Sequence, residues 1–551
     1  MLVAEAVGRA LALLGIDTVF GVVGSGNFHV TNALIAGGAR FVATRHECGA
    51  ATMADAYART SRKVGAISLH QGCGLTNAMT GIAEAAKSRT PLLVLAADTA
   101  AAAVRSNFRV DQDALASAVG ALPERIHSPQ TAVADAARAY RAAAGQRRTV
   151  VLNLPLDIQA AECPEGATAV SGPVPALKPP RPAPEAVTEL ADALTRSQRP
   201  VFVAGRGARI ARARASLERL ADASGALLAT SAVAKGLFNG NPWYLDVSGG
   251  FASPITAELI RGADLVVGWG CALNMWTMRH GTLIGPDATV VQVDLDIDAI
   301  GAHRPVNIGV IGDVDQTALA VADELEASGF ATSGYRSDGL RQRIARESRL
   351  RDVPYEDESG GGRIDPRTLS IALDDLLPAE RVVAIDSGNF MGYPSMYLSV
   401  PDDDGFCFTQ AFQSIGLGLF TAVGAALAQP HRLPVAALGD GGALMAIAEL
   451  ETVVRLDLPM VIVIYDDEAY GAEVHHFGPE GYPLDTVRFP PTDIASIGRG
   501  FGCEGVTVRS TDDLKTVADW VKGPRDKPLV IDAKVVSDHG SWWLEEAFRG
   551  H

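Results

Sequence analysis

Two aspartates, Asp440 and Asp467, are the side chains whose type and spacing most directly suggest chemistry. Asp440 stands in the turn Gly-Asp-Gly-Gly after a short apolar run at 433–438, and Asp467 follows a second, β-branched apolar run at 460–465. Two carboxylates, a backbone carbonyl and phosphate oxygens together offer the oxygen ligands that Mg²⁺ prefers. Taken alone, a Gly-Asp-Gly turn is explained equally well by an aspartate that only caps a helix.

The residues between the two aspartates are expected to bring them together. Residues 443–456 are rich in good helix formers, and Pro459 ends that segment before the second apolar run. The order strand, glycine turn, helix and strand predicts a βαβ unit, whose right-handed crossover places both strand ends at one edge of a parallel sheet. A helix that begins near Ala443 would direct free N–H groups toward that edge, so the site suits a phosphate ester held through a divalent cation.

This stretch resembles the signature of enzymes that depend on thiamine diphosphate (ThDP). The resemblance rests on the Gly-Asp-Gly turn, a Glu-Leu pair in the helix, a strand ending in two polar residues, a following Tyr-Gly, and aspartates 27 residues apart (467 − 440). It implies that Mg²⁺ is bound by Asp440, Asp467 and the backbone carbonyl of Ala469. The family usually has Asn where this chain has Asp467, and the extra charge is expected to hold the metal more tightly but to repel the diphosphate. We therefore expect cofactor binding to depend strongly on the metal.

A second motif, Arg45-His46-Glu47, stands between a predicted strand and a predicted helix. From the residues alone, Glu47 could be a solvated glutamate that stabilises the first turn of the helix. The run FVATRHECGAATMADAYAR at 41–59 also resembles the helix start of the acetolactate synthase-like branch of ThDP enzymes. The resemblance implies that Glu47 hydrogen-bonds N1′ of the aminopyrimidine, which lets the 4′-nitrogen remove the thiazolium C2 proton. It also implies a homodimer or a dimer of dimers, because Glu47 and the metal site would come from different subunits.

A glycine-rich segment at 409–427 contains Ile415, which either packs in the core or supports the bent cofactor; both interpretations predict that it is buried. The cofactor-binding residues that the resemblance implies are Glu47, Ser25, Asn77, Ile415, Gly439, Asp440, Gly441, Gly442, Asp467, Ala469, Tyr470 and Gly471.

The predicted catalytic residues are Glu47, His70, His29 and Gln112. Ser25 and His70 match a serine and a histidine used by benzoylformate decarboxylase, and His29 falls near a histidine region of benzaldehyde lyase. Gln112 resembles a family glutamine that reaches the active site. Each histidine could equally be structural. Further candidates are Gln71, beside His70, and a group that could cover the site as a lid, Glu473, His475 and His476.

The chain of 551 residues is long enough for three domains. Alternating helical and strand-like segments predict an α/β fold of three doubly wound parallel-sheet domains, at 1–162 (pyrimidine-binding), 186–330 (central) and 364–551 (diphosphate-binding). A proline-rich segment, 163–185, and the glycine-rich 333–362 are predicted linkers. The first and third domains share a similar element order.

Gly205-x-Gly207 in the central domain suggests a dinucleotide site, but the motif is incomplete, and turn glycines are the better explanation. FAD, which some acetohydroxyacid synthases bind in this domain, is conceivable, but nothing in 186–330 requires it.

Composition excludes several classes of function. A net charge of −16 argues against nucleic acid and anionic membranes as partners, and no apolar run approaches the ~18 residues of a membrane span. Six scattered cysteines without a C-x-x-C pair argue against a disulfide or zinc framework. The amino-terminal residues lack the features of a signal peptide, so a cytoplasmic location is expected.

These features together predict a ThDP- and Mg²⁺-dependent enzyme that acts on a 2-oxo acid or a 2-hydroxy ketone. Decarboxylation of a pyruvate-like acid followed by ligation to a second carbonyl is the first choice. A 2-oxo acid decarboxylase or a 2-hydroxy ketone lyase is the alternative, and the sequence does not separate these activities, because pocket shape decides whether a second carbonyl enters. The family's synthases commonly carry Ser-Gly-Pro-Gly where this chain has His70-Gln71-Gly72-Cys73, which argues against acetohydroxyacid synthesis. A ThDP-fold subunit that has lost catalysis is the third hypothesis.

Overall fold

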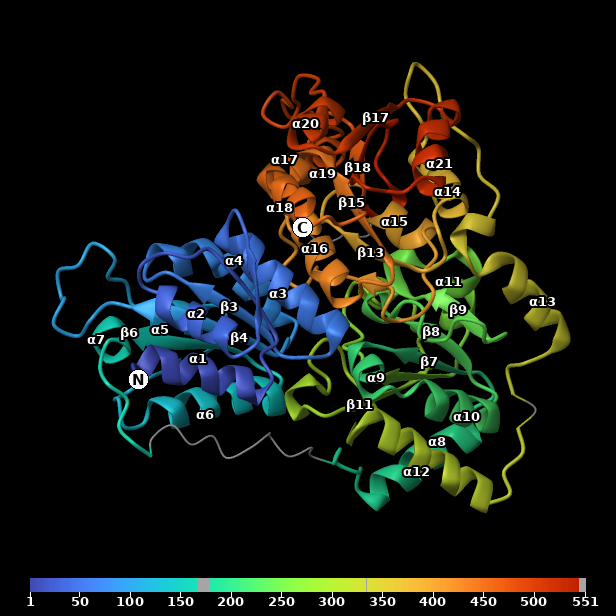
Figure 1. Ribbon diagram of the computed structural model, residues 1–551. Helices are drawn as coiled ribbons and strands as arrows, with labels where there is room; N and C mark the ends of the chain where they lie inside the picture. Colours follow the sequence, from blue (N-terminus) through green and yellow to red (C-terminus); the bar gives the residue numbers. More distant parts are fainter. Residues whose placement is uncertain (167–177, 333, 545–551) are drawn as a thin grey trace.

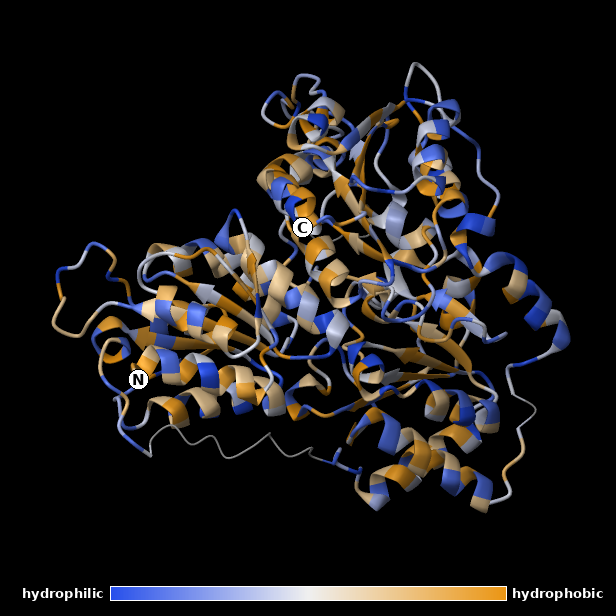
Figure 2. Cartoon of the chain, viewed as in Figure 1, coloured by the Kyte–Doolittle hydropathy of each residue, from blue (hydrophilic) through white to orange (hydrophobic). Residues whose placement is uncertain are grey.

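The computed structural model describes residues 1–166, 178–332 and 334–544. They form three α/β domains, each built on a six-stranded parallel sheet with helices on both faces (Figure 1). The predicted fold class is therefore confirmed. Most strands are apolar and buried, whereas the outer faces of the helices are hydrophilic (Figure 2), as expected for sheets that are covered on both sides. Strands β2 (Arg40–Ala43), β5 (Leu122–Arg125) and β17 (Glu504–Val508) are partly exposed.

The N-terminal domain has the strand order β2-β1-β3-β4-β6-β5. Its strands are β1 (Thr18–Gly21), β2 (Arg40–Ala43), β3 (Gly65–Leu69), β4 (Leu92–Asp98), β5 (Leu122–Arg125) and β6 (Thr149–Pro155). Its helices are α1 (Val3–Leu14), α2 (Phe28–Ala36), α3 (Glu47–Ser61), α4 (Cys73–Lys87), α5 (Gln112–Ala118), α6 (Ala132–Gln146) and α7 (Leu156–Gln159). Strand β5 was not predicted, because its sequence Leu-Pro-Glu-Arg has no apolar run.

The C-terminal domain repeats this topology strand for strand, in the order β14-β13-β15-β16-β18-β17. The predicted similarity between the first and third domains is thus confirmed. The strands are β13 (Arg381–Ile385), β14 (Phe406–Cys407), β15 (Leu433–Gly439), β16 (Val461–Asp466), β17 (Glu504–Val508) and β18 (Leu529–Lys534). The helices are α14 (Pro366–Leu376), α15 (Gly392–Tyr397), α16 (Gly418–Ala428), α17 (Asp440–Met445), α18 (Leu450–Arg455), α19 (Gly471–Phe477), α20 (Ile494–Phe501) and α21 (Lys515–Lys522).

The central domain has a different order, β12-β11-β10-β7-β8-β9, which is that of dinucleotide-binding folds. Its strands are β7 (Pro200–Ala204), β8 (Leu227–Thr230), β9 (Tyr244–Val247), β10 (Leu265–Trp269), β11 (Thr289–Asp294) and β12 (Ile308–Ile311). Its helices are α8 (Pro184–Arg196), α9 (Arg206–Ala211), α10 (Arg214–Ser224), α11 (Pro254–Arg261), α12 (Val314–Ala327) and α13 (Asp338–Glu347).

The structure describes the second of the two predicted linkers almost completely and the first only in part. Residues 167–177 of the proline-rich segment lie outside the described residues. The prediction that 333–362 is only a linker was wrong, because this segment contains helix α13. Ile344 on α13 is buried in the core of the central domain, and the partly buried Tyr335 packs against the same cluster, so apolar side chains tie this stretch to the domain.

The N- and C-terminal domains share one hydrophobic core. Helix α3 packs along α16 between the two sheets (Figure 1), and the buried cluster is continuous from Ile67 in β3 to Ile462 in β16. A Cβ atom at Gly424 on α16 would overlap the carbonyl oxygen of Met53 on α3, so a glycine is needed for this approach. Within the described parts of the chain, no helix is both long enough and apolar enough to cross a bilayer.

Candidate active site

The predicted βαβ unit places Asp440 and Asp467 at the carboxyl edge of the C-terminal sheet. Strands β15 and β16 are parallel neighbours, with Gly439 paired to Tyr465, so the residues that follow the two strands meet. Both aspartates are buried, and both line the same cavity.

The helix after the turn differs from the prediction. Instead of one helix from Ala443 to Leu456, α17 begins at Asp440 and ends at Met445, and a 3₁₀ turn separates it from α18. The earlier start follows from the glycines: a Cβ at Gly442 would overlap the Asp386 carboxylate, and a Cβ at Gly441 would press on the ring of Tyr470. Without side chains at these positions, the chain turns directly from strand into helix.

Burial and mutual repulsion destabilise the two carboxylates. Burial raises the pKa of Asp440, and the charge of Asp466 adds to the effect. Burial also raises the pKa of Asp467, with the charge of Asp440 as the next cause, which shows that the two groups are close enough to interact. Lys534 neutralises Asp466, to which it is directly bonded.

The same pair fits a divalent cation. Asp467 Oδ2 is buried and has no hydrogen-bond partner among the described residues, and a cation would satisfy it and relieve the repulsion. No group of three or more His, Cys, Asp or Glu side chains in the described ranges could hold a metal. The predicted set therefore needs the Ala469 carbonyl and ligand oxygens to complete its coordination.

Ile415 is held near the turn by a residue that sequence reasoning missed. Asp386 follows β13 and accepts hydrogen bonds from Gly416 N (3.0 Å) and Leu417 N (3.2 Å). Burial raises the pKa of Asp386 to about 6. Ile415 lines the cavity and is half-buried, so the prediction that it is buried was wrong. An aspartate directly after a buried strand, the signal used for Asp440, would also have identified Asp386.

Glu47 is the first residue of α3 and is half-buried. Asn77 Nδ2 on α4 donates a hydrogen bond to Glu47 Oε2 (3.1 Å), so two predicted cofactor residues do meet. Glu449 of the C-terminal domain accepts the amide hydrogens of Arg45 (2.8 Å) and His46 (3.1 Å). The orientation of Glu47 therefore depends on a side chain of the other domain, which sequence reasoning did not identify.

The structure brings Ser25 and His70 together, with 3.5 Å between Ser25 Oγ and His70 Nε2. The other ring nitrogen, Nδ1, lies 3.0 Å from Gln71 O. His29 is exposed on α2, where its ring contacts Phe28.

Gln112 is buried, and its amide is fully engaged. Its Oε1 accepts from Gly72 N (2.9 Å), and its Nε2 donates to Ala97 O (3.1 Å) and Asn153 Oδ1 (2.6 Å). These contacts support the loop that follows His70 and give Gln112 a positioning role, while its direct part in catalysis stays a prediction.

The lid candidates Glu473, His475 and His476 lie on helix α19, which begins at Gly471, four residues after Asp467. Glu473 lines the cavity, and burial lowers the pKa of His475. A lid function for them stays a prediction.

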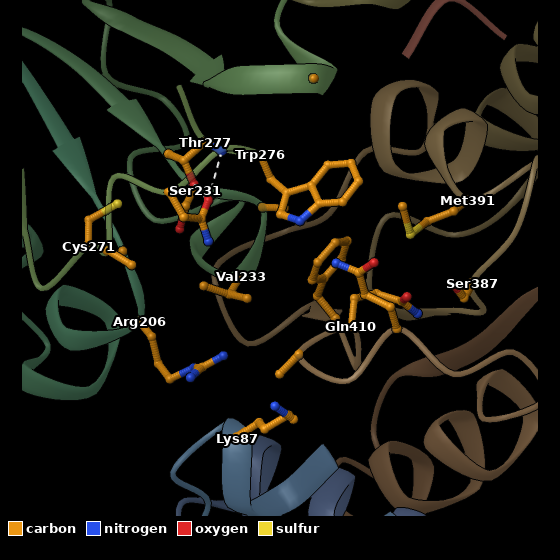
Figure 3. Close-up of a pocket in the computed structure, with 18 of the residues that line it drawn as sticks. Lys87, Arg206, Ser231, Val233, Cys271, Trp276, Thr277, Ser387, Met391 and Gln410 are labelled. Carbon is orange, nitrogen blue, oxygen red and sulfur yellow. Dashed lines mark hydrogen bonds between the residues drawn. The ribbon is translucent and has the colours of Figure 1, made fainter. Parts of the chain in front are cut away.

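A cavity of about 1610 Å³ joins the turn of residues 439–442, the predicted metal turn, to the central domain. Trp276, Met391 and Gln410 lie on one side of it, and Lys87 and Arg206 extend toward it from the other (Figure 3). The cavity-lining residues do not include Glu47, Ser25 or His70.

The central-domain glycines are explained by packing. A Cβ at Gly205 would overlap the carbonyl oxygen of Gly270, and one at Gly207 would lie 2.6 Å from the Cα of Gly270. These glycines let two loops touch, and no phosphate is needed to account for them.

Comparisons with known proteins match all three domains. The chain matches family models described as the N-terminal TPP binding domain (1–119), the central domain (187–321) and the C-terminal TPP binding domain (386–533) of thiamine pyrophosphate enzymes. It is 30% identical to the probable 2-ketoarginine decarboxylase AruI of Pseudomonas aeruginosa, across 93% of this chain and 89% of that protein. It is 28% identical to the sulfoacetaldehyde acetyltransferase of Rhodobacter capsulatus (98% and 96% covered) and to the acetolactate synthase large subunit of Parasynechococcus marenigrum (97% and 87%).

Proposed function

Since the chain belongs to the thiamine pyrophosphate enzyme family, we propose that this enzyme decarboxylates a pyruvate-like 2-oxo acid and ligates the remaining carbons to a second carbonyl, using ThDP and Mg²⁺. The observation that carries the proposal is the buried pair Asp440 and Asp467 at the edge of the sheet, in which Asp467 Oδ2 has no hydrogen-bond partner among the residues that the structure describes. Asp440, Asp467 and the Ala469 carbonyl would hold Mg²⁺ and, through it, the diphosphate.

When bound, ThDP supplies a nucleophilic carbon for the substrate carbonyl and an electron sink for the departing CO₂. The protein's part is to position groups and to move protons. Glu47, oriented by Asn77, would exchange a proton with N1′ of the pyrimidine. Ile415, fixed by the bonds of Asp386 to Gly416 and Leu417, would support the cofactor from the side of the cavity.

We further propose that the active site forms between two copies of this chain, in a homodimer or a dimer of dimers. Within one chain, Glu47 does not line the cavity of the metal turn. Apolar side chains are exposed beside both parts of the predicted site. Phe28, three residues from Ser25 in the N-terminal domain, is 52% exposed, and Met445 on α17, the helix that begins at Asp440, is 53% exposed. Such side chains are common at interfaces between subunits.

A decarboxylase or a 2-hydroxy ketone lyase is the second candidate. The Ser25–His70 pair favours it, because the two side chains lie within 3.5 Å and match a pair used by benzoylformate decarboxylase. The carboligase and the decarboxylase or lyase would use the same cofactor residues. They differ in whether a second carbonyl compound can enter the active site.

The test is turnover of pyruvate with added ThDP and Mg²⁺, following CO₂ and the carbon skeleton of the product together. CO₂ with a five-carbon acetolactate product supports the ligase, whereas CO₂ with acetaldehyde supports the decarboxylase. No CO₂ from pyruvate would direct the assay to aromatic 2-oxo acids and hydroxy ketones. The Glu47→Ala variant is the control and should lose activity by ~10²–10⁴-fold.

A further inference from the structure

Gln410 is a buried glutamine whose carboxamide has no hydrogen-bond partner among the described residues. The residue is 8% exposed, and neither Nε2 nor Oε1 makes a hydrogen bond within the described parts of the chain. It lines the cavity of the metal turn, near Trp276, Met391 and Ser387 (Figure 3).

The loop that carries this glutamine is fixed on both sides by the N-terminal domain. Arg59 Nη1 donates to the carbonyl oxygen of Phe408 (2.8 Å). Glu84 accepts from Ala411 N (3.1 Å) and Phe412 N (2.6 Å). Arg59 and Glu84 also form an ion pair with each other at 2.8 Å. The loop is therefore well anchored on either side of Gln410, which limits its freedom to turn the carboxamide toward another protein group.

An unpaired amide in such a place destabilises the protein. A buried donor or acceptor that loses water without gaining a partner costs free energy, and native proteins pair most such groups. Exceptions concentrate at functional sites, where a ligand supplies the missing partner. Gln410 lies in the wall of the cavity that also contains Asp440 and Asp467, so the missing partner would be a molecule bound beside the cofactor.

We propose that Gln410 determines substrate specificity by binding the anionic end of the 2-oxo acid substrate. Its Nε2 donates to a carboxylate oxygen of that acid. Lys87 and Arg206 also line this cavity, on the side opposite Gln410 (Figure 3), and Arg206 Nη1 donates to Ser88 O (2.9 Å). This assignment rests on the proposed function and adds to it a residue that recognises the substrate.

The first test measures stability without any ligand. Gln410→Met keeps the size of the side chain but removes the unpaired polar atoms, so Tm should rise by about 1–3 °C. The matched control is Gln429→Met, because Gln429 is also buried but has a paired amide: it donates to Asp404 O (2.7 Å) and accepts from Arg432 Nη1 (2.9 Å). Tm should fall in the control. A fall of equal size in Gln410→Met would overturn the proposal, since the amide would then have a structural role.

The second test measures kcat and KM for pyruvate, 2-oxobutanoate and phenylglyoxylate, together with ThDP affinity in Mg²⁺. Gln410→Met should lower kcat/KM by about 10–10²-fold, mainly through KM, and should leave ThDP affinity unchanged. Gln410→Glu should lower kcat/KM further, because the glutamate adds a negative charge that would face the substrate anion. Unchanged kcat/KM in both variants would overturn the proposal.

The two levels of the inference fail in different ways. Wild-type protein that does not bind ThDP would refute the proposed function. Wild-type protein that binds ThDP but turns over none of these acids would likewise refute the proposed function. Wild-type protein that turns them over, with kcat/KM unchanged in both Gln410 variants, would refute only the assignment of Gln410.

Discussion

Glu449 Oε1 accepts the backbone amide hydrogen of Arg45 at 2.8 Å, across 404 positions of the chain. The same oxygen accepts the amide hydrogen of His46. Glu449 follows the metal turn within one βαβ unit, whereas Arg45 and His46 directly precede Glu47. One carboxylate therefore links the segment that carries Glu47 to the segment that carries Asp440, two parts of the predicted active site.

Glu449→Ala should impair both stability and catalysis. It leaves two amide hydrogens without their acceptor, which should cost about 1–3 kcal/mol of unfolding free energy, and it frees the start of α3 so that kcat falls. Urea unfolding and steady-state kinetics measure the two effects. Glu451→Ala is the control, because this neighbour forms partly exposed ion pairs with Arg45 and Arg455 and should cost less than about 1 kcal/mol. Equal effects of the two substitutions would contradict the role of Glu449.

Asp467→Asn should change how cofactor binding depends on the metal. Removing one negative charge should weaken Mg²⁺ binding and reduce the repulsion of the diphosphate, so ThDP should bind better at low Mg²⁺ than it does to the wild type. Calorimetric titration of ThDP over a range of Mg²⁺ concentrations measures both effects. If metal and cofactor affinities were unchanged, the extra charge at this position would have no role.

Mixing two inactive variants should restore activity if the site is shared between subunits. Glu47→Ala and Asp440→Ala damage different halves, so a mixed dimer keeps one intact site. After random exchange of subunits, a 1:1 mixture should recover about a quarter of wild-type activity. Turnover before and after exchange is the measurement, and each variant mixed with itself is the control. A mixture that stays inactive would place both halves of the site in one chain.

Glu84→Gln should destabilise the junction of the N- and C-terminal domains. Glu84 is buried, pairs with Arg59 and accepts two amide hydrogens of the loop beside Gln410. Removing its charge leaves part of the buried Arg59 charge uncompensated, which should cost about 3–5 kcal/mol in urea unfolding. Glu124→Gln, which breaks a more exposed pair with Arg138, should cost less than about 1 kcal/mol. A similar small cost at both positions would show that the Glu84 pair does not secure the junction.

Local features were predictable from the sequence. The apolar runs at 433–438 and 460–465, with a glycine turn between the first run and a helical segment, determine a βαβ unit by themselves. The side-by-side placement of Asp440 and Asp467 follows from the handedness of the crossover. Division into three α/β domains was equally visible. Strand β5 and helix α13 were missed, because their pattern is weak and neighbouring elements determine their structure.

Hydrogen-bond partners in different domains could not be predicted, because they depend on which surfaces meet when the domains fold and pack together. In the sequence, Glu449 was only one half of the Glu-Leu pair in a predicted helix. In the structure it accepts the amide hydrogen of Arg45 in another domain. Gln112 resembled a residue of the active site, but in the structure its buried side-chain oxygen accepts a hydrogen bond from Gly72, in the loop after His70. The sequence by itself determined the cofactor class and the βαβ unit around Asp440, because each of their signals lies within a short segment. Only the tertiary structure decided which polar groups are paired and which, like that of Gln410, stay unpaired, because hydrogen bonding and burial are properties of the packed molecule.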